Sequence, residues 1–117
     1  MHFGVILPNY GKDASPGAIR RTAELAEELG FDSVWTTEHI IVGREAAASY
    51  GRVYDPLVTL GWLAARTERV GLGTSIVILP LHNPKHSRRR LRRCRSCRAA
   101  ASGSASAWAG TARSSIT

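Results

Sequence analysis

Acidic residues in this 117-residue chain all lie at or before Glu68, whereas the segment 87–117 contains eight arginines and no acid. The net charge of +7 therefore divides into −1 for residues 1–86 and +8 for residues 87–117. The basic segment is otherwise rich in Ala, Ser and Gly, and Leu91 and Ile116 are its only branched aliphatic residues. Such a composition cannot bury an apolar core. We therefore expect a folded domain over 1–86 and a disordered, low-complexity basic tail over 87–117.

The sequence argues against a nucleic-acid partner, a metal site and a membrane or secretory location. The tail offers a single aromatic residue for stacking on bases, Trp108, and no recognisable nucleic-acid-binding module, so we expect no specific nucleic-acid partner. Cys94 and Cys97 form a lone CxxC without a second pair or a suitably spaced His, which argues against a metal site. No stretch approaches the ~20 apolar residues of a membrane span, and no secretory leader pattern is present. The expected location is the cytoplasm.

The first part of the chain begins with one strand and one helix. The apolar run 2–7 stops at Pro8, a pattern typical of a strand buried on both faces in a parallel sheet. Ser15 and Pro16 then supply an N-cap and a proline at the first helical position. Gly30 is placed to end that helix in a left-handed turn. The residues at helical spacing, expected to form its inner stripe, are Ile19, Thr22, Leu25 or Ala26, and Leu29.

The same cycle repeats further along the chain. A strand is expected over 31–37, a long loop over 37–54, and a second helix after the capping pair Asp55 and Pro56. A third strand is expected over 70–79. Three strands alternating with two helices predict right-handed crossovers and a parallel sheet. The inner stripe of the second helix is expected at Leu57, Leu60 or Gly61, and Ala64.

Polar clusters follow each expected strand, at 8–10, at 37–39, and at 74–75 together with 81–84. Function in parallel α/β proteins gathers beyond the carboxyl ends of the strands, so chemistry is expected there. His39 is the strongest candidate for proton transfer, because an imidazole exchanges a proton near neutral pH and the neighbouring Glu38 could orient it. A His39 that only hydrogen-bonds its loop is equally compatible with the spacing. Glu38 by itself is better explained as an orienting or salt-bridging carboxylate than as a base.

Two glycines in the third strand are a further signal. Gly71 and Gly73 do not form a dinucleotide-binding fingerprint, because they lie within a strand and no third glycine follows before a helix. Their expected meaning is a close approach of the backbone to a bulge or to a flat ligand.

Three stretches together carry a family resemblance: FGVILPNYG, AEELGFDSVWTTEHI and YDPLVTLGWLAARTERVGLGTSIVILPLHNP. In this combination residues 1–86 resemble the opening of the bacterial luciferase-like monooxygenase superfamily. The nearest branch is the one that uses the deazaflavin coenzyme F-420. The resemblance implies an α/β fold, namely the N-terminal part, with three strands and two helices, of a TIM-type β/α barrel.

The resemblance also implies a function and its residues. It implies a flavin- or deazaflavin-dependent oxidoreductase or monooxygenase acting on a small organic substrate, with coenzyme F-420 as the first choice and FMN as the alternative. Glu38 and His39 match the family's acidic–His pair, whose His donates or accepts a proton at the ring in some deazaflavin members. Ser75 and Ile76 match a non-prolyl cis peptide that backs the ring. The expected coenzyme-binding residues are Asn9, Thr74, Ser75 and Ile76, no metal is expected, and full-length relatives are often homodimers.

The sequence departs from the family after Pro84, where the family continues into a helix and a fourth strand. Joining the last base of each codon to the first two of the next allows 97–117 to encode SGGRLRLGVGVGWNRAEFDY, which matches the family's continuation. We therefore expect the segment 87–117 to be translated out of frame. A barrel of this class needs roughly 250 residues, so the expected product is a truncated, inactive fragment. A nucleic-acid-binding protein and a half-barrel that assembles with a partner are the alternatives.

Overall fold

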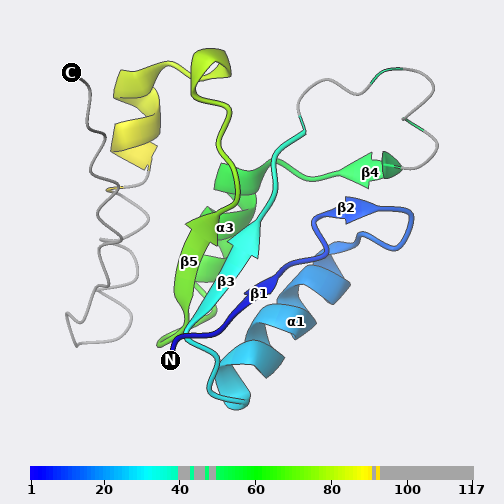
Figure 1. Cartoon of the computed structure of the whole chain (residues 1–117), viewed down its shortest axis with the longest axis vertical. Coiled ribbons are helices and arrows are strands. Elements are labelled where there is room, and N and C mark those ends of the chain that lie inside the picture. Colours follow the sequence, from blue (N-terminus) through cyan, green and yellow to red (C-terminus); the bar gives the residue numbers. More distant parts are fainter. Residues whose placement is uncertain (40–42, 44–46, 48–49, 91, 93–117) are drawn as a thin grey trace.

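The structure is a computed structural model that describes residues 1–39, 43, 47, 50–90 and 92. Figure 1 shows its elements in chain order. They are β1 (Gly4–Ile6), β2 (Tyr10–Gly11), α1 (Pro16–Glu28), β3 (Ser33–Thr36), β4 (Arg52–Val53), α3 (Pro56–Ala64), β5 (Gly71–Thr74) and the 3₁₀ turn η1 (Leu79–Leu81). Residues 84–90 are also helical.

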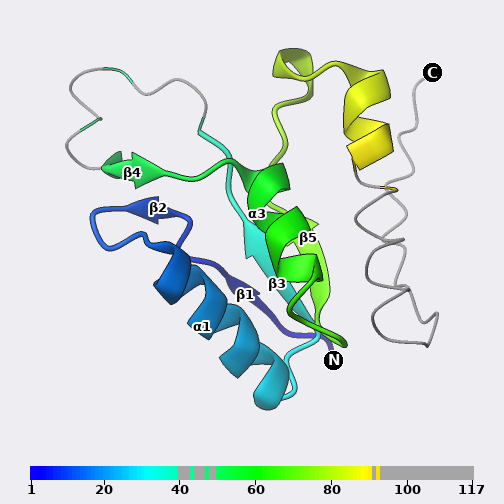
Figure 2. The same cartoon turned by 180° about the vertical axis from the view of Figure 1, so that it is seen from behind.

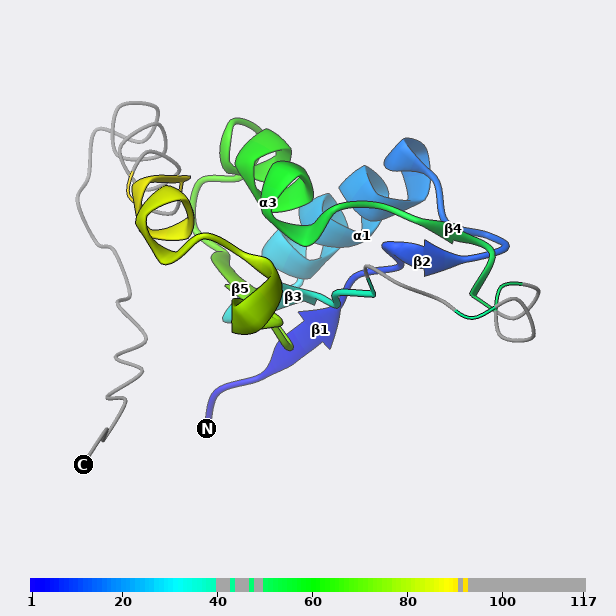
Figure 3. The ribbon, with the colours of Figure 1, turned by 90° about the horizontal axis from the view of Figure 1, so that it is seen from above.

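The strands form one parallel sheet and one short ribbon. The sheet has the order β1-β3-β5, with both neighbouring pairs parallel, as the strand–helix–strand pattern predicts. β2 pairs antiparallel with β4, which lies inside the segment expected to be an irregular loop. Figures 2 and 3 show α1 and α3 side by side on the same face of the sheet.

Burial of the sheet differs from the expectation for the first strand. The sequence predicts a first strand that is buried on both faces. In the structure only one face of β1 is covered, because both helices lie on the same side of the sheet (Figure 3). On the other side Ile6 keeps 60% of its surface exposed. The core lies between the helices and the covered face, and it consists of Leu7, Ile19, Ala23, Ala26, Val34, Leu63 and Val70.

The helix caps predicted from the sequence are confirmed. Ser15 Oγ accepts a hydrogen bond from Ala18 N at 3.1 Å, and Asp55 Oδ1 accepts one from Val58 N at 2.8 Å. In both helices a proline occupies the first turn. Gly30 has a φ of +78°, the left-handed conformation that favours glycine at a helix end.

The inner stripe of α1 is partly different from the predicted one. Of the predicted residues, Ile19 and Ala26, the alternative to Leu25, are buried, whereas Leu25 and Leu29 are 40% and 67% exposed; Ala23 is also buried. The small side chains of Ala23 and Ala26 thus face the sheet, and the two leucines turn outward. In α3 the predicted Leu57, Leu60 and Ala64 are buried, and Leu63 joins them.

The third strand ends earlier than predicted, at Thr74 rather than at residue 79. Ser75 N still donates to Thr36 O at 2.7 Å, which is the last contact with β3 in the ladder pattern. Beyond it, Ile78 N donates to the Glu38 carboxylate instead of a strand carbonyl. A side-chain acceptor therefore replaces the backbone carbonyl of a neighbouring strand, and the chain leaves the sheet here.

The helix over 84–90 crosses the expected domain boundary between residues 86 and 87. Asn83 Oδ1 accepts from Lys85 N at 3.0 Å, which caps the start of this helix. Ser87 is buried, and its N and Oγ both donate to Asn83 O. The rest of the expected tail from residue 93, with its two cysteines, lies outside the described residues. Among the described residues no helix is long and apolar enough to cross a membrane.

Candidate functional site

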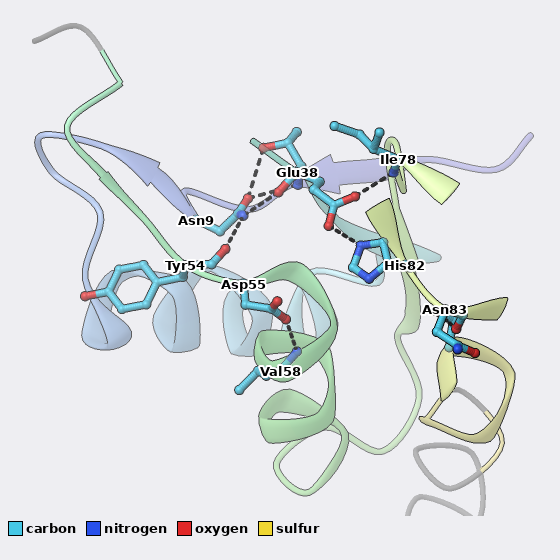
Figure 4. A network of polar contacts seen from close by, with 10 residues as sticks. Asn9, Glu38, Tyr54, Asp55, Val58, Ile78, His82 and Asn83 are labelled. Atoms are coloured by element: carbon cyan, nitrogen blue, oxygen red, sulfur yellow. Dashed lines mark hydrogen bonds and ion pairs between the residues drawn. The ribbon is translucent and has the colours of Figure 1, made fainter. Parts of the chain in front are cut away.

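Asn9 joins three chain segments at the edge where the parallel strands end. Its side chain is fully buried. Nδ2 donates to Thr37 O at 2.7 Å and to Tyr54 O at 3.2 Å, while Oδ1 accepts from Thr37 N at 3.0 Å and Thr37 Oγ1 at 3.2 Å (Figure 4). Every polar atom of this side chain has a protein partner. In this arrangement Asn9 holds the strand-end loops together, and its contact with a coenzyme stays a prediction.

Glu38 lies at the end of β3 with its side chain almost fully buried. Its Oε2 accepts from Ile78 N and its Oε1 contacts His82 Nε2, both at 2.5 Å. The sequence favours a salt-bridging carboxylate at this position, and the structure supplies its partner. That partner is His82, from the third polar cluster, and not the adjacent His39.

His39 is half-buried, and its ring forms a cluster with the rings of Tyr10 and Tyr50, whose own centroids lie 6.0 Å apart. Its ring centroid lies 5.6 Å from that of Tyr10 and 4.5 Å from that of Tyr50. The pairing of β2 with β4 brings these tyrosines to the same place, because Tyr10 lies in β2 and Tyr50 shortly precedes β4. The imidazole therefore has aromatic neighbours, a setting that the sequence did not predict.

A hollow of about 500 Å³ lies on the uncovered side of the sheet, at the carboxyl end of its strands. Its lining combines three predicted residues, Thr74, Ser75 and Ile76, with Ile6 and Trp35. The Ser75–Ile76 peptide is cis, as the resemblance implies. Sequence reasoning missed Ile6 and Trp35. The alternation of side chains along a strand was the available signal, because Ile6 and Trp35 are cross-strand neighbours on one face.

The strand glycines make room for Trp35. A Cβ atom added at Gly73 would lie 2.6 Å from the indole ring, and one added at Gly4 would lie 2.5 Å from Trp35 Nε1. The indole nitrogen donates to Ser33 Oγ at 2.9 Å, which fixes the ring across the sheet. The close approach expected at Gly73 is thus to a side chain of the protein, rather than to a bulge or a ligand.

Charged groups with displaced pKa values lie at the opposite edge of the sheet, near the amino ends of the strands. The His2 side chain and Phe3 N, through their hydrogen bonds, hold the pKa of Asp32 below its ordinary value. Partial burial opposes ionisation of Glu27, but hydrogen bonds from Val70, Arg69 and Glu68 N outweigh it and lower its pKa. Within the described part of the chain no three His, Cys, Asp or Glu side chains cluster to hold a metal ion.

Comparison with known proteins places this chain in a family. A model of the family described as luciferase-like monooxygenase matches residues 1–87. The chain belongs to the luciferase-like monooxygenase family. A crystal structure of a monooxygenase from Streptomyces bottropensis has a similar fold, with a TM-score of 0.65 and 34% identity over 84% of this chain and 30% of that one.

Two curated relatives of this luciferase-like chain have different named activities. An F-420-dependent glucose-6-phosphate dehydrogenase from Kineococcus radiotolerans is 42% identical over 71 residues, which are 60% of this chain and 20% of the relative. A 4-hydroxyprotoasukamycin monooxygenase from Streptomyces nodosus subsp. asukaensis is 34% identical, over 70% of this chain and 22% of its own length. The chain thus spans about a fifth of the length of these relatives.

Proposed function

We propose that this chain forms the N-terminal wall of a flavin-type oxidoreductase that acts on a small organic molecule, with the coenzyme ring against the hollow beside Trp35. The observation that carries the proposal is the lining of that hollow. Ile6, Trp35 and Ile76 give it an apolar surface, and Thr74 and Ser75 add hydroxyl groups at its strand-end side. A flat heterocycle with a polar edge fits this combination, since ligand sites pair apolar walls with a few polar groups.

Coenzyme F-420 is the proposed partner, with FMN as the alternative. The support is the named activity of the Kineococcus relative, which has the higher identity of the two curated relatives described above. The coenzyme supplies hydride or electron transfer when it is bound. The residues of this chain would hold its ring and manage a proton.

His39 is the proposed proton donor or acceptor. Its ring is half-buried, and the contacts with Tyr10 and Tyr50 fix its position at the strand-end edge. Glu38 does not share the proton of His39 in this proposal, because its carboxylate is engaged by Ile78 N and His82. Thr74, Ser75 and Ile76 line the ring-binding surface.

A TIM-type barrel is the proposed architecture of the whole enzyme. Among the described residues, β1 and β5 each pair with β3 alone, so each keeps one unpaired edge. Further strands of a barrel would cover these edges and enclose the open face that carries Trp35. The cytoplasmic location, the homodimer and the out-of-frame origin of 87–117 stay predictions.

The test is a chimera in which residues 1–83 replace the corresponding segment of the Kineococcus dehydrogenase. We expect this chimera to bind coenzyme F-420, measured by fluorescence titration, and to bind FMN more weakly. Replacing Ile76 by Ala should weaken F-420 binding by about 5- to 10-fold, the cost of removing apolar contact surface. Val58→Ala is the matched control, because Val58 is 67% exposed on α3 and Ile76 is 75% exposed in the hollow. Equal affinities for both variants would refute the proposed ring site.

A further inference from the structure

The carboxylate of Glu38 and the imidazole of His82 form a buried pair between distant parts of the chain. Their side chains are 1% and 11% exposed. Figure 4 shows the carboxylate between two partners, with one oxygen toward Ile78 N and the other toward His82 Nε2. A carboxylate oxygen accepts hydrogen bonds, so we expect Nε2 of His82 to carry the hydrogen of this contact.

This pair fastens the segment 75–82 to the end of β3. Ser75 N donates to Thr36 O at the beginning of the segment, Ile78 N reaches Glu38 in its middle, and His82 reaches Glu38 at its end. Two of the three contacts therefore depend on one carboxylate. The same segment contains Ser75 and Ile76, which line the hollow.

Burial explains why the contacts are strong. A carboxylate removed from water is costly unless hydrogen bonds replace its hydration, and charge-assisted bonds inside a protein are about twice as strong as neutral ones. Glu38 has no buried unpaired oxygen, and among the described residues no buried side-chain polar atom lacks a partner. If His82 loses its donor, one oxygen of Glu38 is left buried without that partner.

We propose that Glu38 and His82 are positioning residues, which act as one latch that holds the segment 75–82 against the end of β3. The latch sets the place of Ser75 and Ile76, and Glu38 does not act on His39. The latch positions Ser75 and Ile76 whether or not a coenzyme binds. Only its relevance to a coenzyme rests on the proposed function.

The experiment uses the 117-residue chain and three substitutions of the latch. His82→Phe keeps a ring of similar size and removes the donor, His82→Gln keeps a donor, and Glu38→Gln removes the charge. His86→Phe is the matched control, because His86 is an exposed histidine four residues away. Two readouts are measured by NMR: hydrogen exchange of the Ile78 amide relative to the core amide of Val34, and the ¹⁵N signals of the His82 ring.

We expect His82→Phe and Glu38→Gln to speed exchange at Ile78 by about 10- to 100-fold relative to Val34, the usual effect of losing a charge-assisted bond. His82→Gln should restore most of the protection, and His86→Phe should change nothing. In the unmodified chain at high pH the ¹⁵N signals should show hydrogen on Nε2 of His82, and Glu38→Gln should abolish that preference. A residue that only fills space would not set this tautomer.

Three results would overturn the latch. They are unchanged Ile78 exchange in His82→Phe, no rescue by His82→Gln, and a His82 ring with hydrogen on Nδ1. If His82→Phe unfolds the chain, so that Val34 also loses protection, the exchange rate of the Ile78 amide is compared between His82→Gln and Glu38→Gln. Slower exchange in His82→Gln supports the latch, and equal rates overturn it. Shifts of the Ile76 signals on these substitutions would support the latch. The proposed ring site is tested separately, by coenzyme F-420 titration of the chimera and of its Ile76→Ala variant.

Discussion

Replacing Glu27 by Gln should lower the free energy of unfolding, because its carboxylate holds the turn between α3 and β5. Glu27 Oε2 accepts from the backbone N–H groups of Arg69, Val70 and Glu68, at 2.7, 2.8 and 3.0 Å. The three donors are consecutive, and Glu27 is 41 or more residues away along the chain. One side chain at the end of α1 therefore anchors the entry into β5.

The expected magnitude follows from the charge on these bonds. A hydrogen bond to a charged group contributes about 1.5–3 kcal/mol, whereas a neutral one contributes about 0.5–1.5 kcal/mol. Gln keeps one acceptor oxygen and loses the charge. Glu27 is only half-buried, so solvent screens part of the difference, and we expect a net loss of about 1–2 kcal/mol.

The effect should depend on pH in a fixed direction. The folded protein lowers the pKa of Glu27 below its ordinary 4.5, so between the folded and unfolded pKa values the unfolded chain binds more protons. The contribution of Glu27 is therefore present above about pH 5 and is lost as the pH falls through the folded pKa. Glu27→Gln removes this contribution, and its stability should vary less over the same window.

The assay is urea unfolding followed by tryptophan fluorescence at several pH values between 3 and 7. Glu28→Gln is the matched control, because Glu28 is its exposed neighbour and pairs only loosely with Arg21, at 3.7 Å. The control should cost less than about 0.5 kcal/mol, as exposed ion pairs do. Equal losses in both variants, or a Glu27→Gln loss that is the same at pH 3 and pH 7, would refute the reasoning.

Three further predictions address the sheet, the site and the tail. Gly73→Ala should destabilise the fold by about 1–3 kcal/mol in the same urea assay, because the added Cβ would meet the Trp35 ring. Gly17→Ala is the control and should not destabilise the fold, because open space surrounds Gly17. Equal stability of the two variants would contradict this prediction. In the chimera, His39→Ala should lower kcat by about 10²–10⁴-fold with a smaller effect on coenzyme affinity, and near-normal turnover would return His39 to a loop role. Sequencing the genomic locus should show the family's continuation in another frame across 87–117, and its absence would end that hypothesis.

Local signals in the sequence determined the helix boundaries and the order of elements. Ser15 and Asp55 cap their helices through bonds to backbone N–H groups three residues away, and Gly30 adopts its left-handed φ. These interactions depend on neighbours in the chain, so composition and spacing suffice to predict them. The cis peptide at Ser75 was predictable only through the family resemblance, because nothing in its own residue types requires it.

Contacts between distant segments were decided by the tertiary structure alone. Glu38 has His39 beside it in the sequence and His82 beside it in space, 44 residues away. Successive residues of a strand point to opposite sides, so adjacency in the chain says little about which side chains meet. The outward position of Leu25 and Leu29 has the same kind of cause: the spacing allows Leu25 or Ala26 in the inner stripe, and packing against the sheet buries Ala26 together with Ala23. The periodicity of apolar residues limits which helix residues can be buried, and packing between elements determines which of them are.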